Sequence, residues 1–120
     1  MKRGAGAAGA DAESRAADFL AAQGLAIVAR NVRSRFGEID LVARDGDVLV
    51  FVEVRLRSGG AFGGAAASIT RAKQSRLIAA GRIYLANLRH EPPCRFDAVL
   101  FDGTGSREPV WQRNVIDTSQ

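Results

Sequence analysis

The sequence predicts an α/β protein in which a helix, three strands, a second helix and two further strands follow one another. Two segments carry apolar residues at helical spacing, and the segments between and after them alternate or are rich in β-branched residues. The chain has 120 residues, of which 47% are hydrophobic and 25% charged. That composition and length suit one compact core, and they argue against a disordered chain or two domains.

The first helix is expected over residues 10–23. Its apolar positions follow the i, i+4, i+7, i+8 spacing of one helix face, at Ala12, Ala16, Phe19 and Leu20, and Gly24 supplies a stop. The preceding residues 1–9 are rich in Gly and Ala, and we expect them to be disordered. This leaves residues 10–117 as a single domain.

Three strands are expected next, over residues 25–33, 38–43 and 48–57. The last two flank Asp45-Gly46, a dipeptide that favours a two-residue hairpin turn. A turn at that position places Glu38 opposite Glu53, and it places Asp40 opposite Phe51. Strand alternation puts three carboxylates and an arginine on one face, at Glu38, Asp40, Glu53 and Arg55. The other face is an apolar core layer of Ile39, Leu41, Val50, Val52 and Val54.

The second half begins with residues 58–67, which contain four glycines and are expected to form a mobile loop. A helix then starts with Ser68 or Thr70 as its N-cap and runs to about Leu88. Its apolar stripe consists of Leu77, Tyr84, Leu85 and Leu88. The last two strands are expected over 96–101 and 110–116, separated by a turn at 102–105.

Composition also narrows the chemistry. His90 and Cys94 alone cannot build a zinc site, and their loop, which contains two prolines, disfavours a nucleophilic dyad. The net charge is +4, and Lys2 and Lys73 are the only lysines among 17 basic residues. The planar guanidinium of arginine binds phosphate well, so nucleic acid is a natural partner. A genomic bias towards arginine codons would produce the same excess of arginine over lysine. Without a membrane span or signal peptide in the sequence, we expect a cytoplasmic protein.

The three clustered carboxylates must repel one another unless something compensates their charge. A divalent cation such as Mg²⁺ would do so, because it binds carboxylate oxygens, water and substrate phosphate. Neutralisation by Arg55, by Arg57 or by a basic residue of the second helix would serve equally well. Spacing alone leaves both explanations open.

Two strings, GEIDLVA at residues 37–43 and VFVEVRLR at 50–57, resemble the PD-(D/E)xK nuclease motif. More narrowly, the chain resembles the YraN family of small bacterial proteins, which is similar to archaeal Holliday-junction resolvases. Shorter supporting matches are Glu13, Arg30-Asn31, Arg71-Ala72-Lys73 and Arg95-Phe96-Asp97. The resemblance covers residues 11–115. It implies a restriction-endonuclease-like fold with a central mixed sheet flanked by helices.

The resemblance also implies roles for individual residues. Asp40 and Glu53 would be catalytic ligands of Mg²⁺ or Mn²⁺, with Glu38 and Glu13 as further ligands. Arg55 occupies the position of the usual motif lysine and would act as a fixed cation, because arginine stays protonated and cannot serve as a base. The DNA backbone would be gripped by the loop 58–67 and by basic residues at Arg30, Arg33, Arg35, Arg57, Arg71 and Lys73.

Three functions follow as hypotheses. The first is a metal-dependent endonuclease or resolvase acting on DNA phosphodiesters, branched DNA included; RNA stays open, as does a homodimer that addresses two strands. The second is a nucleic-acid-binding module of the same fold with little or no turnover, and Arg55 is its best support. The third is another hydrolase, with Glu38 and Glu53 as acid and base. A glycosidase would need exposed aromatic platforms, and the eight aromatic residues fall mostly at core positions.

Overall fold

The computed structural model describes residues 6–56, 69–101 and 108–116, the first five of them as backbone only. Its elements are α1 (Gly6–Ala22), β1 (Ala26–Ser34), β2 (Gly37–Asp45), β3 (Val48–Leu56), α3 (Arg71–Ala86), β4 (Cys94–Phe101) and β5 (Val110–Gln112). The predicted order of elements is confirmed. Helix α1 starts four residues before the predicted start, and β5 ends four residues before the predicted end. The predictions for Arg57, the loop 58–67 and the turn 102–105 lie outside the described residues.

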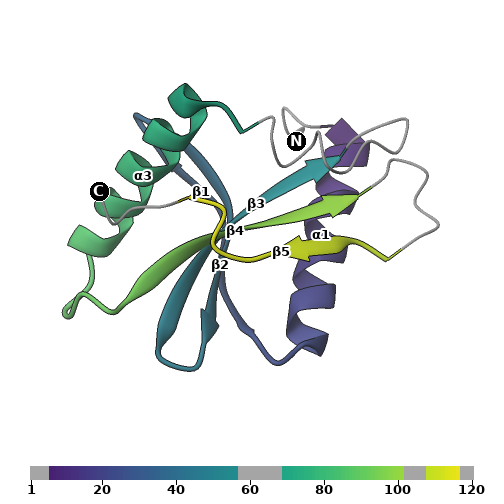
Figure 1. Cartoon of the computed structure of the whole chain (residues 1–120), viewed down its shortest axis with the longest axis horizontal. Coiled ribbons are helices and arrows are strands. Elements are labelled where there is room, and N and C mark those ends of the chain that lie inside the picture. Colours follow the sequence, from purple (N-terminus) through teal and green to yellow (C-terminus); the bar gives the residue numbers. More distant parts are fainter. Residues whose placement is uncertain (1–5, 57–68, 102–107, 117–120) are drawn as a thin grey trace.

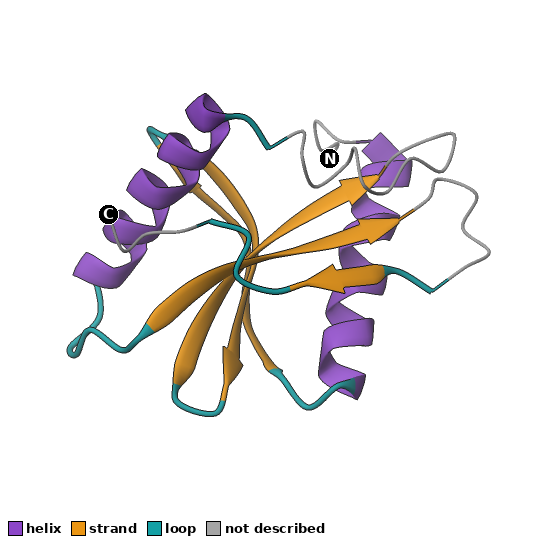
Figure 2. Cartoon of the chain, viewed as in Figure 1, coloured by secondary structure: helices purple, strands orange, loops and turns teal. Residues whose placement is uncertain are grey.

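The five strands form one mixed sheet in the order β1-β2-β3-β4-β5. Strands β3 and β4 run parallel, joined by the crossover that contains α3, and all other neighbours are antiparallel. Helix α1 lies on one face of the twisted sheet and α3 on the opposite face (Figure 1). The same three layers are visible by secondary structure in Figure 2. The predicted mixed sheet flanked by helices is therefore confirmed.

Each helix covers its own apolar cluster. The α1 side contains Leu20, Leu41, Val50, Val52 and Val99, and the α3 side contains Val42, Phe51, Leu77, Phe96 and Leu100. The prediction that Ile39 shares a face with Leu41 is wrong, because Ile39 is buried on the α3 side. Its partner on β1, Val32, packs there too. Between Arg30 and Val32, Asn31 has φ +52°, and this left-handed residue interrupts the strand alternation.

The β2–β3 hairpin has a different register from the predicted one. Asp45 pairs with Val48, so the turn residues are Gly46 and Asp47 rather than Asp45 and Gly46. Gly46 has φ +62° and occupies the first central position, where two-residue hairpin turns require a positive φ. The predicted pairing of Asp40 with Phe51 is wrong, because Phe51 pairs with Val42.

Helix α3 begins where Thr70 caps it, as one of the two predicted alternatives stated. The Thr70 hydroxyl accepts a hydrogen bond from the Lys73 N–H at 3.1 Å. Leu77 is buried on the sheet, whereas Leu88 lies beyond the helix end and is 37% exposed, so its place in the buried stripe was predicted wrongly. Among the described residues, no helix is both long and apolar enough to cross a membrane.

Candidate metal centre

Three carboxylates, those of Glu13, Glu38 and Asp40, form what we call the acidic group. Asp40 lies where β2 and β3 stop pairing. Their pairing extends from Asp45↔Val48 to Leu41↔Val52. Beyond it, the Val54 N–H donates to Asp40 Oδ2 at 2.8 Å, so a carboxylate takes the place of the ladder carbonyl. The pKa of Asp40 is raised from 3.8 to about 8, chiefly by burial and then by the negative charge of Glu53. The hydrogen bond from Val54 opposes this rise in pKa only in part.

Two further carboxylates approach Asp40, one from β2 and one from α1. Among the described residues, Glu13, Glu38 and Asp40 each offer a ligand oxygen, and these oxygens all lie within 4.8 Å of one another. The negative charges of Glu13 and Glu38 contribute to the raised pKa of Asp40. The three side chains are half-buried, so their mutual repulsion is only partly screened by water.

Asn31 joins the two glutamates of this group. With its amide nitrogen directed towards the carboxylates, Asn31 donates to Glu38 Oε2 at 2.7 Å and to Glu13 Oε1 at 2.9 Å. The left-handed backbone of Asn31, which Asn tolerates better than most residues, accompanies this contact. Sequence reasoning used Asn31 only as part of a matching string and missed this role. The signal that would have suggested it is an Asn in the middle of a segment predicted to be a strand.

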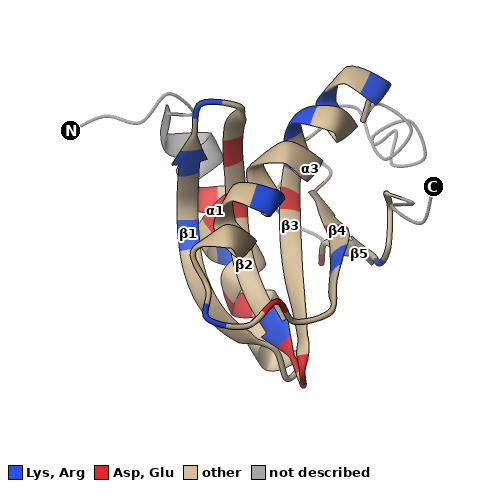
Figure 3. Cartoon of the chain, turned by 90° about the vertical axis from the view of Figure 1, so that its left-hand side faces the viewer, with Lys and Arg blue, Asp and Glu red and all other residues tan. Residues whose placement is uncertain are grey.

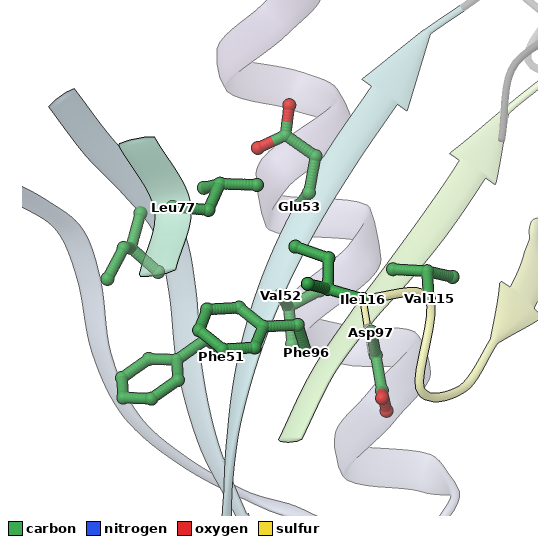
Figure 4. Close-up of a pocket in the computed structure, with 9 residues that line it drawn as sticks. Phe51, Val52, Glu53, Leu77, Phe96, Asp97, Val115 and Ile116 are labelled. Carbon is green, nitrogen blue, oxygen red and sulfur yellow. The ribbon is translucent and has the colours of Figure 1, made fainter. Parts of the chain in front are cut away.

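Glu53 is buried and neutralised by cations from two elements. Only 6% of the residue is exposed, and its Oε2 lies 3.5 Å from Arg55 Nη1 and 3.4 Å from Lys73 Nζ. Lys73 reaches it from the first turn of α3, which Thr70 caps. The carboxylate points away from the apolar cavity that its own stem helps to line (Figure 4). The neutralisation that spacing left open is therefore realised at Glu53.

Three acidic side chains line one open cavity, whereas Glu38 lines a separate, smaller pocket together with Lys73. The open cavity has a volume of about 320 Å³, and its polar walls include Glu13, Asp40, Glu53 and Arg55. The ligands on offer are carboxylate oxygens only, and this is the donor set that Mg²⁺ and Mn²⁺ accept. The residues present therefore fit a hard divalent cation, and the high pKa of Asp40 means that binding such a cation must displace a proton.

The basic residues predicted to bind nucleic acid differ in exposure where the structure describes them. Arg30 and Arg33 on β1, Arg35 in the β1–β2 turn and Arg71 at the start of α3 are exposed, whereas Lys73 is half-buried against Glu53. The β1–β2 turn and the start of α3 lie at the same end of the molecule, with the acidic segments of β2 and β3 between them (Figure 3).

A second buried carboxylate, Asp97 on β4, has a structural setting. Its oxygens accept from Arg95 Nε, from Trp111 Nε1 at 3.0 Å and from the Asn114 N–H at 2.9 Å. Arg95 also binds Asp45 at 3.0 Å, next to the hairpin turn. Asp97 is 1% exposed and fully occupied by donors, so it fixes the C-terminal strand rather than offering a ligand.

These features define a class: an α/β protein with a helix-covered mixed sheet and a carboxylate cluster suited to a divalent cation at one end of the sheet. The chain belongs to the UPF0102 family, because the family model described as "Uncharacterised protein family UPF0102" matches residues 12–101.

Curated relatives agree with this assignment. A UPF0102 protein of Nitrosomonas europaea is 57% identical over 115 residues, which is 96% of this chain and 98% of the relative. A UPF0102 protein of Nitrosospira multiformis is 53% identical, over 92% of this chain and 93% of the relative. A UPF0102 protein of Cupriavidus taiwanensis is 61% identical over 80% of this chain and 74% of its own.

Proposed function

We propose that this protein is a metal-dependent endonuclease that binds nucleic acid and hydrolyses DNA phosphodiesters at the carboxylate cluster. The observation that carries the proposal is the group formed by Glu13, Glu38 and Asp40, whose ligand oxygens lie within 4.8 Å of one another beside buried Glu53. The resemblance of residues 37–43 and 50–57 to the PD-(D/E)xK motif of resolvase-like nucleases supports the same activity.

Each residue of the site has a distinct part in this proposal. The carboxylates of Glu13, Glu38, Asp40 and Glu53 would hold Mg²⁺ or Mn²⁺. When bound, such an ion supplies Lewis-acid stabilisation of phosphate and lowers the pKa of water. Arg55 holds a fixed positive charge at the cavity wall, where it can bind a phosphate oxygen through its planar fork. Lys73, whose Nζ lies 3.4 Å from Glu53 Oε2, would supply a lysine amine where the motif lysine is replaced by Arg55.

The surrounding basic residues account for substrate binding. Arg33, Arg35 and Arg71 are exposed at the end of the molecule where the acidic group lies (Figure 3). Contacts of this kind bind backbone phosphates without reading base sequence. Affinity for DNA is therefore expected to fall steeply with salt and to depend little on sequence.

A binding module without turnover is the second candidate. Its support is specific: Arg55 replaces the motif lysine, and Glu53 already has two cationic partners within 3.5 Å. In that case the acidic group and its cations would order the nucleic-acid surface without cutting the strand.

Single-turnover cleavage separates the two candidates. The substrates are a branched, a flapped and a linear DNA with Mg²⁺ or Mn²⁺, and the proteins are the native chain, Asp40→Asn, Glu53→Gln and Arg55→Lys. A working nuclease loses cleavage in Asp40→Asn and Glu53→Gln and keeps part of it in Arg55→Lys. Asp47→Asn, in the exposed turn at the other end of the hairpin, is the matched control and should cut like the native chain. Cleavage that survives Glu53→Gln unchanged would reveal a contaminating nuclease.

Binding is tested separately. Arg33→Ala and Arg71→Ala should each weaken affinity for all DNA sequences alike and reduce the salt slope by about one phosphate's worth. Arg44→Ala, also exposed but next to the β2–β3 turn, is the control. No detectable binding to DNA or RNA at low salt would overturn the proposed function altogether.

A further inference from the structure

One aromatic side chain stands apart from the rest. Phe36 is 39% exposed, and it is the only aromatic residue among the exposed large hydrophobic residues of the described chain. It lies in the two-residue turn between Ser34, the last residue of β1, and Gly37, the first of β2. A ring with this exposure can contact a ligand at the surface through its apolar face.

The turn that carries Phe36 is held in one conformation. The Phe36 N–H donates to Ser34 Oγ at 3.1 Å, and the Ser34 hydroxyl donates to the Gly37 carbonyl at 3.1 Å. Gly37 has φ +138°, a conformation that residues with a side chain rarely adopt. A ring held on such a turn loses little conformational entropy when it binds a ligand.

One cation contacts the ring, which lies close to the acidic group. The Arg35 guanidinium carbon lies 5.1 Å from the ring centroid, and Arg33, three residues before Phe36, is exposed. Gly37, the residue after Phe36, lies next to helix α3, because a methyl group in place of its hydrogen would come within 4.0 Å of Arg76 Cβ. Glu38, a member of the acidic group, follows Phe36 by two residues, so the two Cα atoms are about 7 Å apart or less.

From this arrangement we infer that Phe36 is a stacking site for an unpaired base of the DNA strand whose backbone lies at the acidic group. The inference rests on the proposed function and specifies its substrate further. Arginines beside an exposed aromatic ring are the combination that binds single strands, because the cations hold the phosphates and the ring stacks on a base. A fully paired duplex would engage the arginines but leave the ring without a base to stack on.

The test is equilibrium binding by fluorescence anisotropy in EDTA, so that no strand is cut. One fluorescein-labelled oligonucleotide is used single-stranded, in a duplex with a short gap, and as a blunt duplex. Phe36→Ala should weaken binding to the single strand and the gapped duplex by about 5- to 150-fold, the usual contribution of one stacked base. Its effect on the blunt duplex should stay under about twofold, since phosphate contacts alone act there.

Matched variants separate stacking from bulk and from charge. Phe36→Tyr keeps the ring and should retain affinity, whereas Phe36→Leu keeps an apolar side chain and should behave like Phe36→Ala. Arg35→Ala should weaken all three DNAs alike. Val28→Ala, exposed on β1, is the control and should change nothing. A Phe36→Ala variant that binds every DNA as the native chain does, or loses all equally, overturns the stacking site and leaves the proposed function standing. A native chain that binds none of these DNAs overturns both.

Discussion

The titration of Asp40 offers the sharpest test of the acidic group. In the metal-free protein its pKa is about 8, against 3.8 for an ordinary aspartate, because the carboxyl is buried and faces Glu53. The folded chain therefore binds this proton more tightly than the unfolded chain does. The stability linked to that proton is complete below about pH 3.8 and is lost as pH rises through about 8.

The size of the effect follows from the pKa. Each pH unit in which the folded carboxyl keeps its proton and the unfolded one does not changes the free energy of unfolding by about 1.4 kcal/mol. From pH 6 to pH 8, the native chain should lose about 2 kcal/mol relative to Asp40→Asn, which cannot titrate. The substitution is conservative, because the Asn oxygen can still accept the hydrogen bond from the Val54 N–H.

The measurement is urea unfolding of both proteins at pH 6, 7, 8 and 9 in EDTA. The difference in the free energy of unfolding between native chain and variant should shift in favour of Asp40→Asn from pH 6 to pH 8 and level off towards pH 9. Asp47→Asn, exposed in the hairpin turn, should track the native chain at every pH. Curves for the native chain and Asp40→Asn that stay parallel from pH 6 to 9 would refute the reasoning, because Asp40 would then have an ordinary pKa.

Three further predictions follow from the same contacts. Mg²⁺ or Mn²⁺ should raise the melting temperature and release about 0.9 proton per ion at pH 7, measured by calorimetry in two buffers, and Asp40→Asn should abolish both effects. Asn31→Gly keeps the left-handed backbone but removes the side-chain amide, so it should weaken metal binding with little change in the free energy of unfolding in urea, whereas Asn31→Ala should lower both metal affinity and stability. Equal metal affinity in the native chain and the two variants would exclude a role for the amide. Asp97→Asn should lower the free energy of unfolding by about 3 kcal/mol, since Arg95 and Trp111 lose a buried charged acceptor, and a change below about 1 kcal/mol would contradict that network.

Much of the fold could be read from local pattern. Helical spacing located α1 and α3, and residue type narrowed the α3 cap to Ser68 or Thr70, of which the structure uses Thr70. Alternation and the position of the Gly-containing turn located the β2–β3 hairpin and drew attention to its carboxylates. These features depend on residues within a few positions of one another, and side-chain periodicity and backbone preference act at that range.

The metal centre was decided by tertiary structure. A turn moved by one residue changed the hairpin register, so that the acidic residue directed towards the Val54 N–H is Asp40. Glu13 meets Glu38 only because α1 packs across the sheet, and Lys73 meets Glu53 only because α3 covers the other face. The raised pKa of Asp40 has the same origin, since burial and the charge of distant residues produce it. Sequence alone determined which chemical groups this protein has and which elements carry them. The distances between these groups and their charge states depend on how the elements pack, because packing brings together residues that are far apart along the chain.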